Sequence, residues 1–283
     1  MATELNAGAG RVDEQDLKAA EQAAEIYGKL RDELSRVIIG QDEVLKQVLI
    51  ALFSQGHCLL EGVPGLAKTL MISSIAEMLS LDFSRIQFTP DLMPSDITGH
   101  AIYDMASEQF KLRKGPVFTN LLLADEINRA PAKTQAALLE VMQERQVTLE
   151  GRALAAPQPF LVMATQNPIE QEGTYPLPEA ELDRFMLMLR MDYPQADEEL
   201  TLVRQVTRSV RTDILDVSGL RVLLQAKDVQ ALQKIASDLP LDDQVLDYAV
   251  RLARATRSWP GLALGAGPRA SIALVRCARA RAL

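Results

Sequence analysis

The sequence has few of the residues that build disulfides and metal sites, with two cysteines and two histidines in 283 residues. Neither Cys58 nor Cys277 has another cysteine or a histidine at the spacing of a metal-binding motif, so we expect both in the core. His57 and His100 are equally isolated. The sequence therefore does not predict a structural zinc site.

Long apolar runs and an excess of basic charge are also absent. No run approaches the ~20 apolar residues of a membrane-spanning helix, and residues 1–10 lack the pattern of a signal peptide, which predicts a cytoplasmic protein. The net charge of −8 disfavours an extended contact with nucleic-acid phosphates. With 48% hydrophobic and 24% charged residues, the composition is that of a soluble globular protein.

What the sequence does contain is a glycine loop between a strand-like run and a helix. The run His57–Leu60 leads into Gly62-Val63-Pro64-Gly65-Leu66-Ala67-Lys68-Thr69-Leu70, the phosphate loop G-x-x-x-x-G-K-[ST] with Ala67 in place of the last glycine. Such a loop points successive N–H groups at phosphate oxygens, and the following helix adds the positive end of its dipole. We expect Lys68 to reach the β- and γ-phosphates of a nucleotide and Thr69 to bind Mg²⁺. An ordinary turn between a strand and a helix is the alternative.

A second motif follows at the distance that a phosphate-loop fold requires. Residues 121–124 are a continuous apolar run, typical of a strand buried on both faces of a parallel sheet, and they precede Asp125 and Glu126. Ligands bind at the carboxyl ends of such strands. We expect Asp125 to hold Mg²⁺ through water and Glu126 to accept a proton from an attacking water. A strand that ends in solvated acids is the alternative, and the phosphate loop makes it the weaker one.

The N-terminal part is predicted to be helical after a disordered tail over 1–14. Apolar residues at helical spacing predict helices over 15–36 and 41–53. Ile38 and Ile39 lie between them, where they line an adenine pocket or simply pack against the helices. After the phosphate loop we expect a helix over 70–79 and a strand over 83–89.

The middle of the chain predicts an insertion and a hairpin. Residues 91–119 are too many for a plain loop, so we expect an inserted element with a function of its own. A helix over 134–145, a hairpin over 146–154 and a buried strand over 160–164 follow. Asn167 then faces the nucleotide side of the sheet, where its amide could orient the attacking water, unless Asn167-Pro168 is only a turn.

The last part of the chain changes from strands to helices. A short helix over 179–183 precedes a last strand over 184–189, and Tyr193-Pro194 marks the expected domain boundary. Helices are predicted near 196–208, 227–237, 242–258 and 268–283.

Five separated motifs in this order resemble the MoxR group of AAA+ ATPases. They are residues 62–69, 121–129 (Leu-Leu-Leu-Ala-Asp-Glu-Ile-Asn-Arg), 164–168, 182–185 (Leu-Asp-Arg-Phe) and 267–270 (Gly-Pro-Arg-Ala). The resemblance implies an α/β P-loop NTPase core with a parallel sheet over 15–193, followed by a smaller all-α lid domain over 194–283. It also implies that 91–119 hold a helix 2 insert and 146–154 the hairpin before sensor 1.

The resemblance further implies residue roles, with ATP and Mg²⁺ as cofactors. Asn167 would be the sensor 1 residue, Arg184 the arginine finger offered to a neighbouring subunit and Arg269 the sensor 2 arginine of the lid. Together with Glu126 these are the expected catalytic residues. Arg129 is a second candidate for the arginine that acts in trans. The group is described as chaperone-like, so we expect a homo-oligomer, a hexameric ring, that remodels a client protein with a von Willebrand factor A-type domain protein as a family partner.

The sequence departs from the family pattern in two places, and other functions stay open. Gly267 stands where serine is expected, which loosens the turn before Arg269, and the chain stops inside a helical pattern, so the lid is either short or truncated. A chelatase-like or helicase-like motor of the same clade is one alternative, although the acidic balance disfavours a helicase. A nucleotide-gated binding module without turnover is another, and the presence of Glu126 and Arg184 disfavours it.

Overall fold

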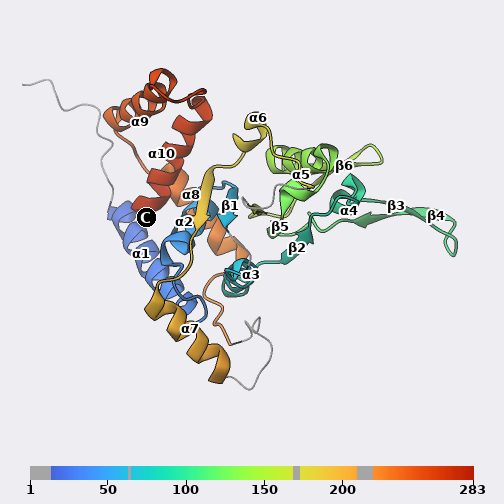
Figure 1. Cartoon of the computed structure of the whole chain (residues 1–283), viewed down its shortest axis with the longest axis horizontal. Coiled ribbons are helices and arrows are strands. Elements are labelled where there is room, and N and C mark those ends of the chain that lie inside the picture. The colour runs from blue at the N-terminus through green and yellow to red at the C-terminus, as the bar shows by residue number, and fades with distance from the viewer. Residues whose placement is uncertain (1–13, 63–64, 168–172, 209–218) are drawn as a thin grey trace, which may run out of the picture.

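The structure is a computed structural model in which residues 14–62, 65–167, 173–208 and 219–283 are described. Its centre is a five-stranded sheet in the order β2-β5-β8-β1-β9 (Figure 1). The strands are β1 (Cys58–Gly62), β2 (Phe83–Gln87), β5 (Leu121–Asp125), β8 (Leu161–Gln166) and β9 (Leu187–Met191). Every neighbouring pair is parallel. The predicted α/β fold with a parallel sheet core is confirmed.

Helices cover both faces of this sheet. One face carries α1 (Glu14–Leu34), α2 (Asp42–Phe53) and α3 (Lys68–Met78), and the other carries α5 (Ala132–Glu144). Each of these helices begins and ends within two residues of its predicted bounds. The predicted tail over 1–14 lies outside the described residues except for Glu14, with which α1 begins.

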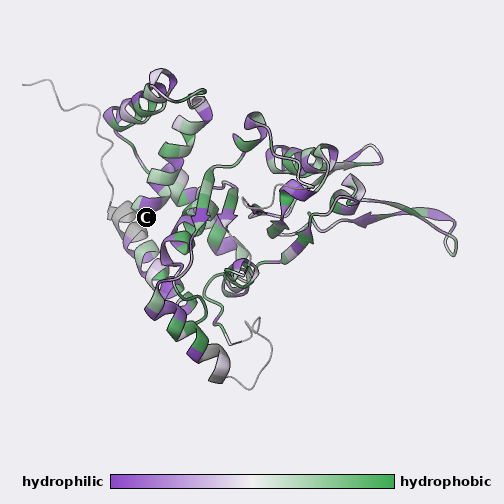
Figure 2. Ribbon diagram, in the orientation of Figure 1, coloured by the Kyte–Doolittle hydropathy of each residue, from purple (hydrophilic) through white to green (hydrophobic). Residues whose placement is uncertain are grey.

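The central strands are apolar up to their carboxyl ends because both of their faces are covered. In β5, Leu121 and Leu123 join the core under α2 and α3, whereas Leu122 and Ala124 join the core under α5. Burying one such leucine contributes roughly 1.5–3 kcal/mol. Figure 2 shows apolar segments along the strands of this sheet. These two cores fix β1, β5 and β8 side by side, so their carboxyl ends meet at one edge.

Residues 91–119, for which the sequence predicts an inserted element, form a short helix and a hairpin. They contain α4 (Pro94–Thr98) and an antiparallel hairpin of β3 (Gly99–Asp104) and β4 (Gln109–Lys114), which projects away from the sheet (Figure 1). The hairpin carries exposed apolar side chains, among them Met105 at 86% and Phe110 at 74% exposure.

The base of this hairpin is a close crossing of two backbone segments at Gly99 and Gly115. A Cβ atom on Gly99 would lie 2.6 Å from the Gly115 nitrogen, and one on Gly115 would lie 2.2 Å from the carbonyl oxygen of Ile97. Gly99 also has a φ of 94°, which other residues rarely adopt. Only glycine fits at either position.

Several strands differ from their predicted bounds, and β2 ends at Gln87 rather than at residue 89. Strand β8 runs past Ala164 to Gln166, and β9 begins at Leu187 rather than Arg184. The backbone N–H groups of Arg184 and Phe185 donate to the carbonyls of Glu181 and Leu182, so this segment is a turn after α6 (Glu179–Leu182) and does not pair with β1. The hairpin predicted over 146–154 is present as β6 (Gln146–Leu149) and β7 (Arg152–Ala155).

The described residues after Met191 contain only helices, as predicted. These are α7 (Ala196–Arg208), α8 (Ala226–Asp238), α9 (Asp243–Ala255), the 3₁₀ turn η2 (Thr256–Ser258) and α10 (Pro268–Ala282). Val229 of α8 belongs to the same core as α2, and the buried Gln233 amide donates to the Leu52 carbonyl at 2.7 Å. The domain boundary at Tyr193-Pro194 stays a prediction. None of the described helices is both long and apolar enough to cross a membrane.

Candidate functional site

A cavity of about 450 Å³ lies where the phosphate loop meets the carboxyl ends of β5 and β8. Its described lining consists of Gly62, Gly65, Leu66, Ala67, Lys68, Thr69, Leu70, Arg85, Gln87, Asp125, Glu126, Thr165 and Asn167. All of these except Arg85, Gln87 and Thr165 are predicted site residues. Of the other predicted loop residues, Val63 and Pro64 lie outside the described part of the chain. The structure therefore brings the two motifs together around one space.

The phosphate loop turns where its glycines and Ala67 allow it. Gly65 has a φ of 87° and Ala67 a φ of 55°, and α3 begins at the next residue, Lys68. Alanine in this left-handed region costs about 1 kcal/mol more than glycine would, so Ala67 makes the loop slightly strained. The Lys68 Nζ atom donates to the Gly62 carbonyl at 2.7 Å and so lies back across the loop. Burial lowers the pKa of Lys68, and the nearby charges of Asp125 and Glu126 partly offset this effect.

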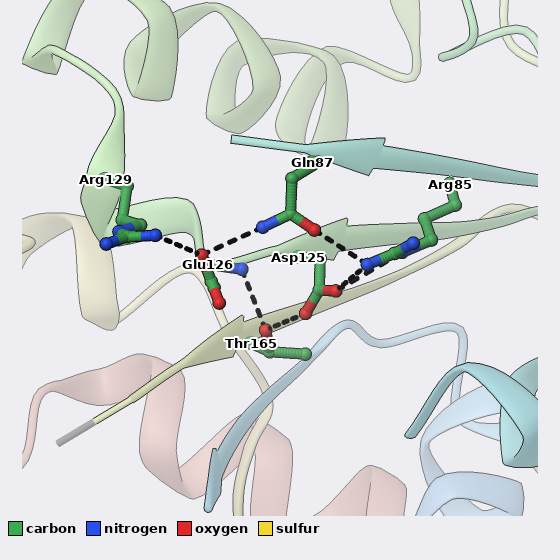
Figure 3. Close-up of polar contacts among 6 residues, drawn as sticks. All are labelled: Arg85, Gln87, Asp125, Glu126, Arg129 and Thr165. Atoms are coloured by element: carbon green, nitrogen blue, oxygen red, sulfur yellow. Dashed lines mark hydrogen bonds and ion pairs between the residues drawn. The ribbon is translucent and has the colours of Figure 1, made fainter. Parts of the chain in front are cut away.

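Asp125 is held by two partners from neighbouring strands (Figure 3). One carboxylate oxygen accepts from the Thr165 hydroxyl at 2.6 Å, and the other accepts from Nη2 and Nε of Arg85 at 2.6 and 3.2 Å. Arg85 Nη2 also donates to the Gln87 side chain at 2.7 Å. The aspartate is therefore fixed in orientation and paired with a cation at the bottom of the cavity.

Glu126 is held in the same way, one residue later (Figure 3). Its Oε2 atom accepts from the Gln87 amide at 2.9 Å and from Arg129 Nη1 at 3.1 Å, and its backbone N–H donates to Thr165 Oγ1 at 2.8 Å. The residue has a φ of 55°, a left-handed conformation that costs about 1–3 kcal/mol and that clusters at functional sites. Arg129, the second candidate for a trans-acting arginine, thus contacts Glu126 of its own chain.

Arg85, Gln87 and Thr165 are site residues that the sequence analysis missed. The signal for the first two was the alternation of β2, which puts residues 85 and 87 on one side of the strand near its carboxyl end. In the parallel register Gln87 pairs with Asp125. Thr165 was placed after its strand, but β8 continues through it and brings its hydroxyl beside both acids.

The remaining predictions for this cavity have mixed outcomes. Asn167 is buried, at 8% exposure, and lines the cavity beyond the end of β8. Ile38 is buried in the core under α2, and neither Ile38 nor Ile39 belongs to the described lining of the cavity. Their role at an adenine ring stays a prediction.

Comparisons with known proteins agree with this geometry. Residues 57–187 match the family described as "ATPase family associated with various cellular activities (AAA)". The chain is 47% identical over 274 residues to Chaperone MoxR1 of Mycobacterium tuberculosis, which covers 92% of this chain and 70% of the relative. This chain belongs to the MoxR group of AAA+ ATPases.

Other members and a solved structure extend the match to most of the chain. It is 45% identical over 258 residues to the uncharacterized protein YeaC of Bacillus subtilis, covering 91% of this chain and 79% of the relative. A crystal structure of a candidate ATPase from Cytophaga hutchinsonii is 41% identical with a TM-score of 0.84, covering 94% of this chain and 82% of the other. The AAA+ fold therefore includes the helical part as well as the sheet, and the membership supports a chaperone-like ATPase role.

The two arginines expected from this family lie together, away from the phosphate loop. Arg184 and Arg269 line a second cavity of about 400 Å³, between the end of α5, the turn before β9 and the start of α10. Arg269 Nη1 lies 3.6 Å from Asp183 Oδ2. No described residue lines both cavities. The resemblance assigns Arg269 to the lid as the sensor 2 arginine, and in this structure it lines the same cavity as Arg184, so its role stays a prediction.

The chemistry of the first cavity suits a magnesium nucleotide. The Thr69 hydroxyl and the Asp125 carboxylate are hard oxygen ligands of the kind that Mg²⁺ prefers, and both face the same space. Lys68 adds one positive charge, and the N-terminus of the 11-residue helix α3 adds a partial one. The residues present therefore fit the Mg²⁺ and ATP that the AAA+ family implies.

Proposed function

We propose that this MoxR-group protein hydrolyses ATP in a Mg²⁺-dependent reaction at a site shared by two copies of the chain. One copy supplies the phosphate-loop cavity, and the next supplies the cavity that holds Arg184 and Arg269. The observation that carries the proposal is the separation of these two sets of residues into two cavities of the same chain. A chain so arranged has both halves of a phosphoryl-transfer site, and head-to-tail contacts between copies would join them.

Within one copy, each residue has a task set by its chemistry. Lys68 and the loop N–H groups bind the β- and γ-phosphates, and Thr69 and Asp125 would hold Mg²⁺, which neutralises phosphate charge when bound. Glu126 accepts the proton of the attacking water, and the Asn167 amide orients that water. The bonds of Glu126 to Gln87 and Arg129 hold its carboxylate in place until water and nucleotide are present.

Between copies, the arginines supply the charge that the first cavity lacks. Phosphoryl transfer spreads negative charge over the γ-phosphate oxygens, and an arginine supplied in trans is worth about 10³–10⁵ in rate in related NTPases. Arg184 is our first choice because it lies on the turn before β9 and is only partly buried. The neighbouring Arg269 would act from the same side. Both would then report ATP binding from one subunit to the next.

We further propose that turnover drives remodelling or maturation of a client protein by a homo-oligomeric ring, which we expect to be hexameric. The support is the membership in a group with a named chaperone, together with the projecting hairpin of β3 and β4 and its exposed Met105 and Phe110. A von Willebrand factor A-type domain protein as partner is an expectation from the family, and a cytoplasmic location is the expectation from the sequence.

Mixing two inactive variants tests the shared site. Arg184→Ala chains keep an intact phosphate loop, and Lys68→Ala chains keep an intact arginine cavity. We expect the mixture to recover part of the ATPase activity that neither variant has alone. Light scattering serves as the control for assembly. If mixed oligomers form and the mixture stays inactive, Arg184 does not act across the interface.

A further inference from the structure

The second cavity contains more positive charge than Arg184 and Arg269 account for. Four arginines line it, namely Arg145, Arg184, Arg269 and Arg276, whereas Asp183 is the only acidic residue in its described lining. Asp183 is already paired with Arg269. In the described part of the chain, no ion pair involves Arg145, Arg184 or Arg276.

Such a group of like charges is unfavourable in an isolated chain. The four guanidinium groups repel one another, and the single acid of the described lining does not offset this repulsion. A ligand with several negative charges removes this cost and gains from each guanidinium. The planar fork of an arginine is suited to phosphate oxygens, which it binds through two parallel N–H donors. The charge and the donor geometry of this cavity would suit a phosphate-bearing anion.

Arg145 stands out within this group because of its backbone. It caps the C-terminus of α5 with a φ of 54°, in the left-handed region where glycine is the favoured residue. Its N–H donates to the Val141 carbonyl at 2.8 Å and its carbonyl accepts from Ala156 at 2.9 Å, so the backbone is fixed on both sides. An arginine at such a position is strained relative to glycine, and residues in this conformation cluster at functional sites.

The side chain of Arg145 has only a neutral partner among the described residues. Its Nη1 and Nη2 atoms donate to the side chain and the carbonyl of Gln55, at 3.2 and 3.5 Å. These bonds orient the guanidinium along the wall of the cavity without compensating its charge. The residue is exposed, so the remaining N–H donors are accessible to a ligand.

We propose that Arg145 is a further phosphate-binding residue in trans, which acts with Arg184 and Arg269 on the nucleotide held by the phosphate loop of a neighbouring copy. This inference rests on the proposed function, because the ligand is the phosphate tail of the neighbour's ATP. Arg145 lies at the end of α5, directly before the β6–β7 hairpin. A phosphate bound by Arg145 would therefore also affect the position of that hairpin.

The first experiment uses the mixture of Lys68→Ala and Arg184→Ala chains and adds Arg145→Gln to one of the two chains at a time. In the Lys68→Ala chain, which supplies the arginine cavity, we expect the substitution to lower the recovered ATPase activity at least ~10-fold. In the Arg184→Ala chain, which supplies the phosphate loop, we expect no change. If the loss instead follows the Arg184→Ala chain, Arg145 acts within its own subunit and the inference is wrong.

The second experiment needs no turnover and so separates the inference from the proposed function. In the Glu126→Gln background with ATP, we expect Arg145→Gln to raise the chain concentration for half-maximal assembly at least ~10-fold in light scattering, since it removes a charge contact made only between copies. The affinity of dilute chains for a fluorescent ATP analogue should be unchanged. Assembly that is insensitive to Arg145→Gln overturns the inference. If Arg145→Gln weakens assembly but the mixture of Arg184→Ala and Lys68→Ala chains is inactive, the role assigned to Arg184 is wrong and that of Arg145 is not.

Two matched variants test whether the charge of Arg145 causes the effect. A free phosphate ligand then tests whether the cavity binds a free anion or the ATP of the neighbouring copy. Arg145→Lys keeps the charge and should recover part of the assembly. Arg152→Gln removes an exposed arginine from the adjacent hairpin, outside the cavity lining, and should have no effect. Inorganic tripolyphosphate serves as the free ligand. If it binds dilute chains tightly and Arg145→Gln removes this binding without changing assembly, the cavity is a site for a free anion and not for the neighbour's ATP.

Discussion

Replacing His57 should remove a pH-dependent part of the protein's stability. The imidazole is buried between α5 and β8, where Nδ1 accepts from the Val162 N–H at 3.0 Å and Nε2 lies 3.1 Å from the Met142 carbonyl oxygen. The Phe160 ring packs edge-on at 5.6 Å. Because Nδ1 accepts and a carbonyl can only accept, the neutral ring carries its proton on Nε2. A second proton on Nδ1 would face the Val162 donor.

The magnitude follows from the pKa. Burial, and to a lesser degree the charge of Arg145, lower the pKa of His57 from 6.5 to about 4. Because the pKa of His57 is lower in the folded than in the unfolded protein, the neutral ring is favoured by folding. The stability it contributes is present above pH 6.5 and is lost as the pH falls toward about 4. The difference between 6.5 and about 4 corresponds to about 3 kcal/mol at full protonation, of which about 2 kcal/mol is lost between pH 7 and pH 5.

The assay is urea unfolding at pH 7, 6 and 5 for the wild type and for His57→Gln. The amide of glutamine keeps a donor and an acceptor but does not titrate, so the variant controls for the carboxylates that also respond to pH. The other histidine, His100, is exposed. We expect the wild type to lose about 2 kcal/mol more than His57→Gln between pH 7 and pH 5. Parallel losses in the two proteins would refute the structural role assigned to the neutral ring.

Three further predictions concern the phosphate-loop cavity. Lys68→Ala should weaken nucleotide binding at least ~10²-fold, measured by calorimetry, because the loop N–H groups alone cannot neutralise the phosphate charge, and an affinity within a few-fold of wild type would mean that the loop is only a turn. Glu126→Gln should keep ATP affinity and lower phosphate release at least ~10²-fold, because an amide cannot accept the proton, and loss of binding instead would make Glu126 structural. Thr165→Val should lower turnover about 10-fold and the free energy of unfolding by about 1–3 kcal/mol, since it leaves the Glu126 N–H without its acceptor. Thr165→Ser keeps the hydroxyl and should behave as wild type, and equal effects of the two substitutions would exclude the hydrogen bonds as the cause.

The elements that could be predicted from the sequence are those whose signal is local. The continuous apolar run before Asp125 is typical of a strand covered on both faces, and residues 62–69 match the phosphate-loop pattern. These two signals placed Lys68, Thr69, Asp125 and Glu126 around one cavity. The helices are equally local, because apolar spacing fixes their buried face.

What the sequence could not provide depends on contacts between distant segments. Arg85 and Gln87 became site residues only through the pairing of β2 with β5, a register that no local pattern specifies. Arg184 was placed in a strand because Phe185 to Leu189 is apolar, yet its N–H is used by the turn after α6. The position of Arg269 beside Arg184 follows from the packing of α10, which lies more than 80 residues after Asp183 in the chain.

The crossing of Gly99 and Gly115 restricts how the β3–β4 hairpin can change during evolution. A shift of β3 along β4 would replace Gly99 at the crossing by a residue with a Cβ atom. A Cβ atom at the position of Gly99 would lie 2.6 Å from the Gly115 nitrogen, so the register at the base of the hairpin is fixed. Insertions and deletions are then tolerated only at the far end, between Asp104 and Gln109. Related chains can accordingly diversify the tip of the hairpin while the sheet core and the root of the hairpin stay unchanged.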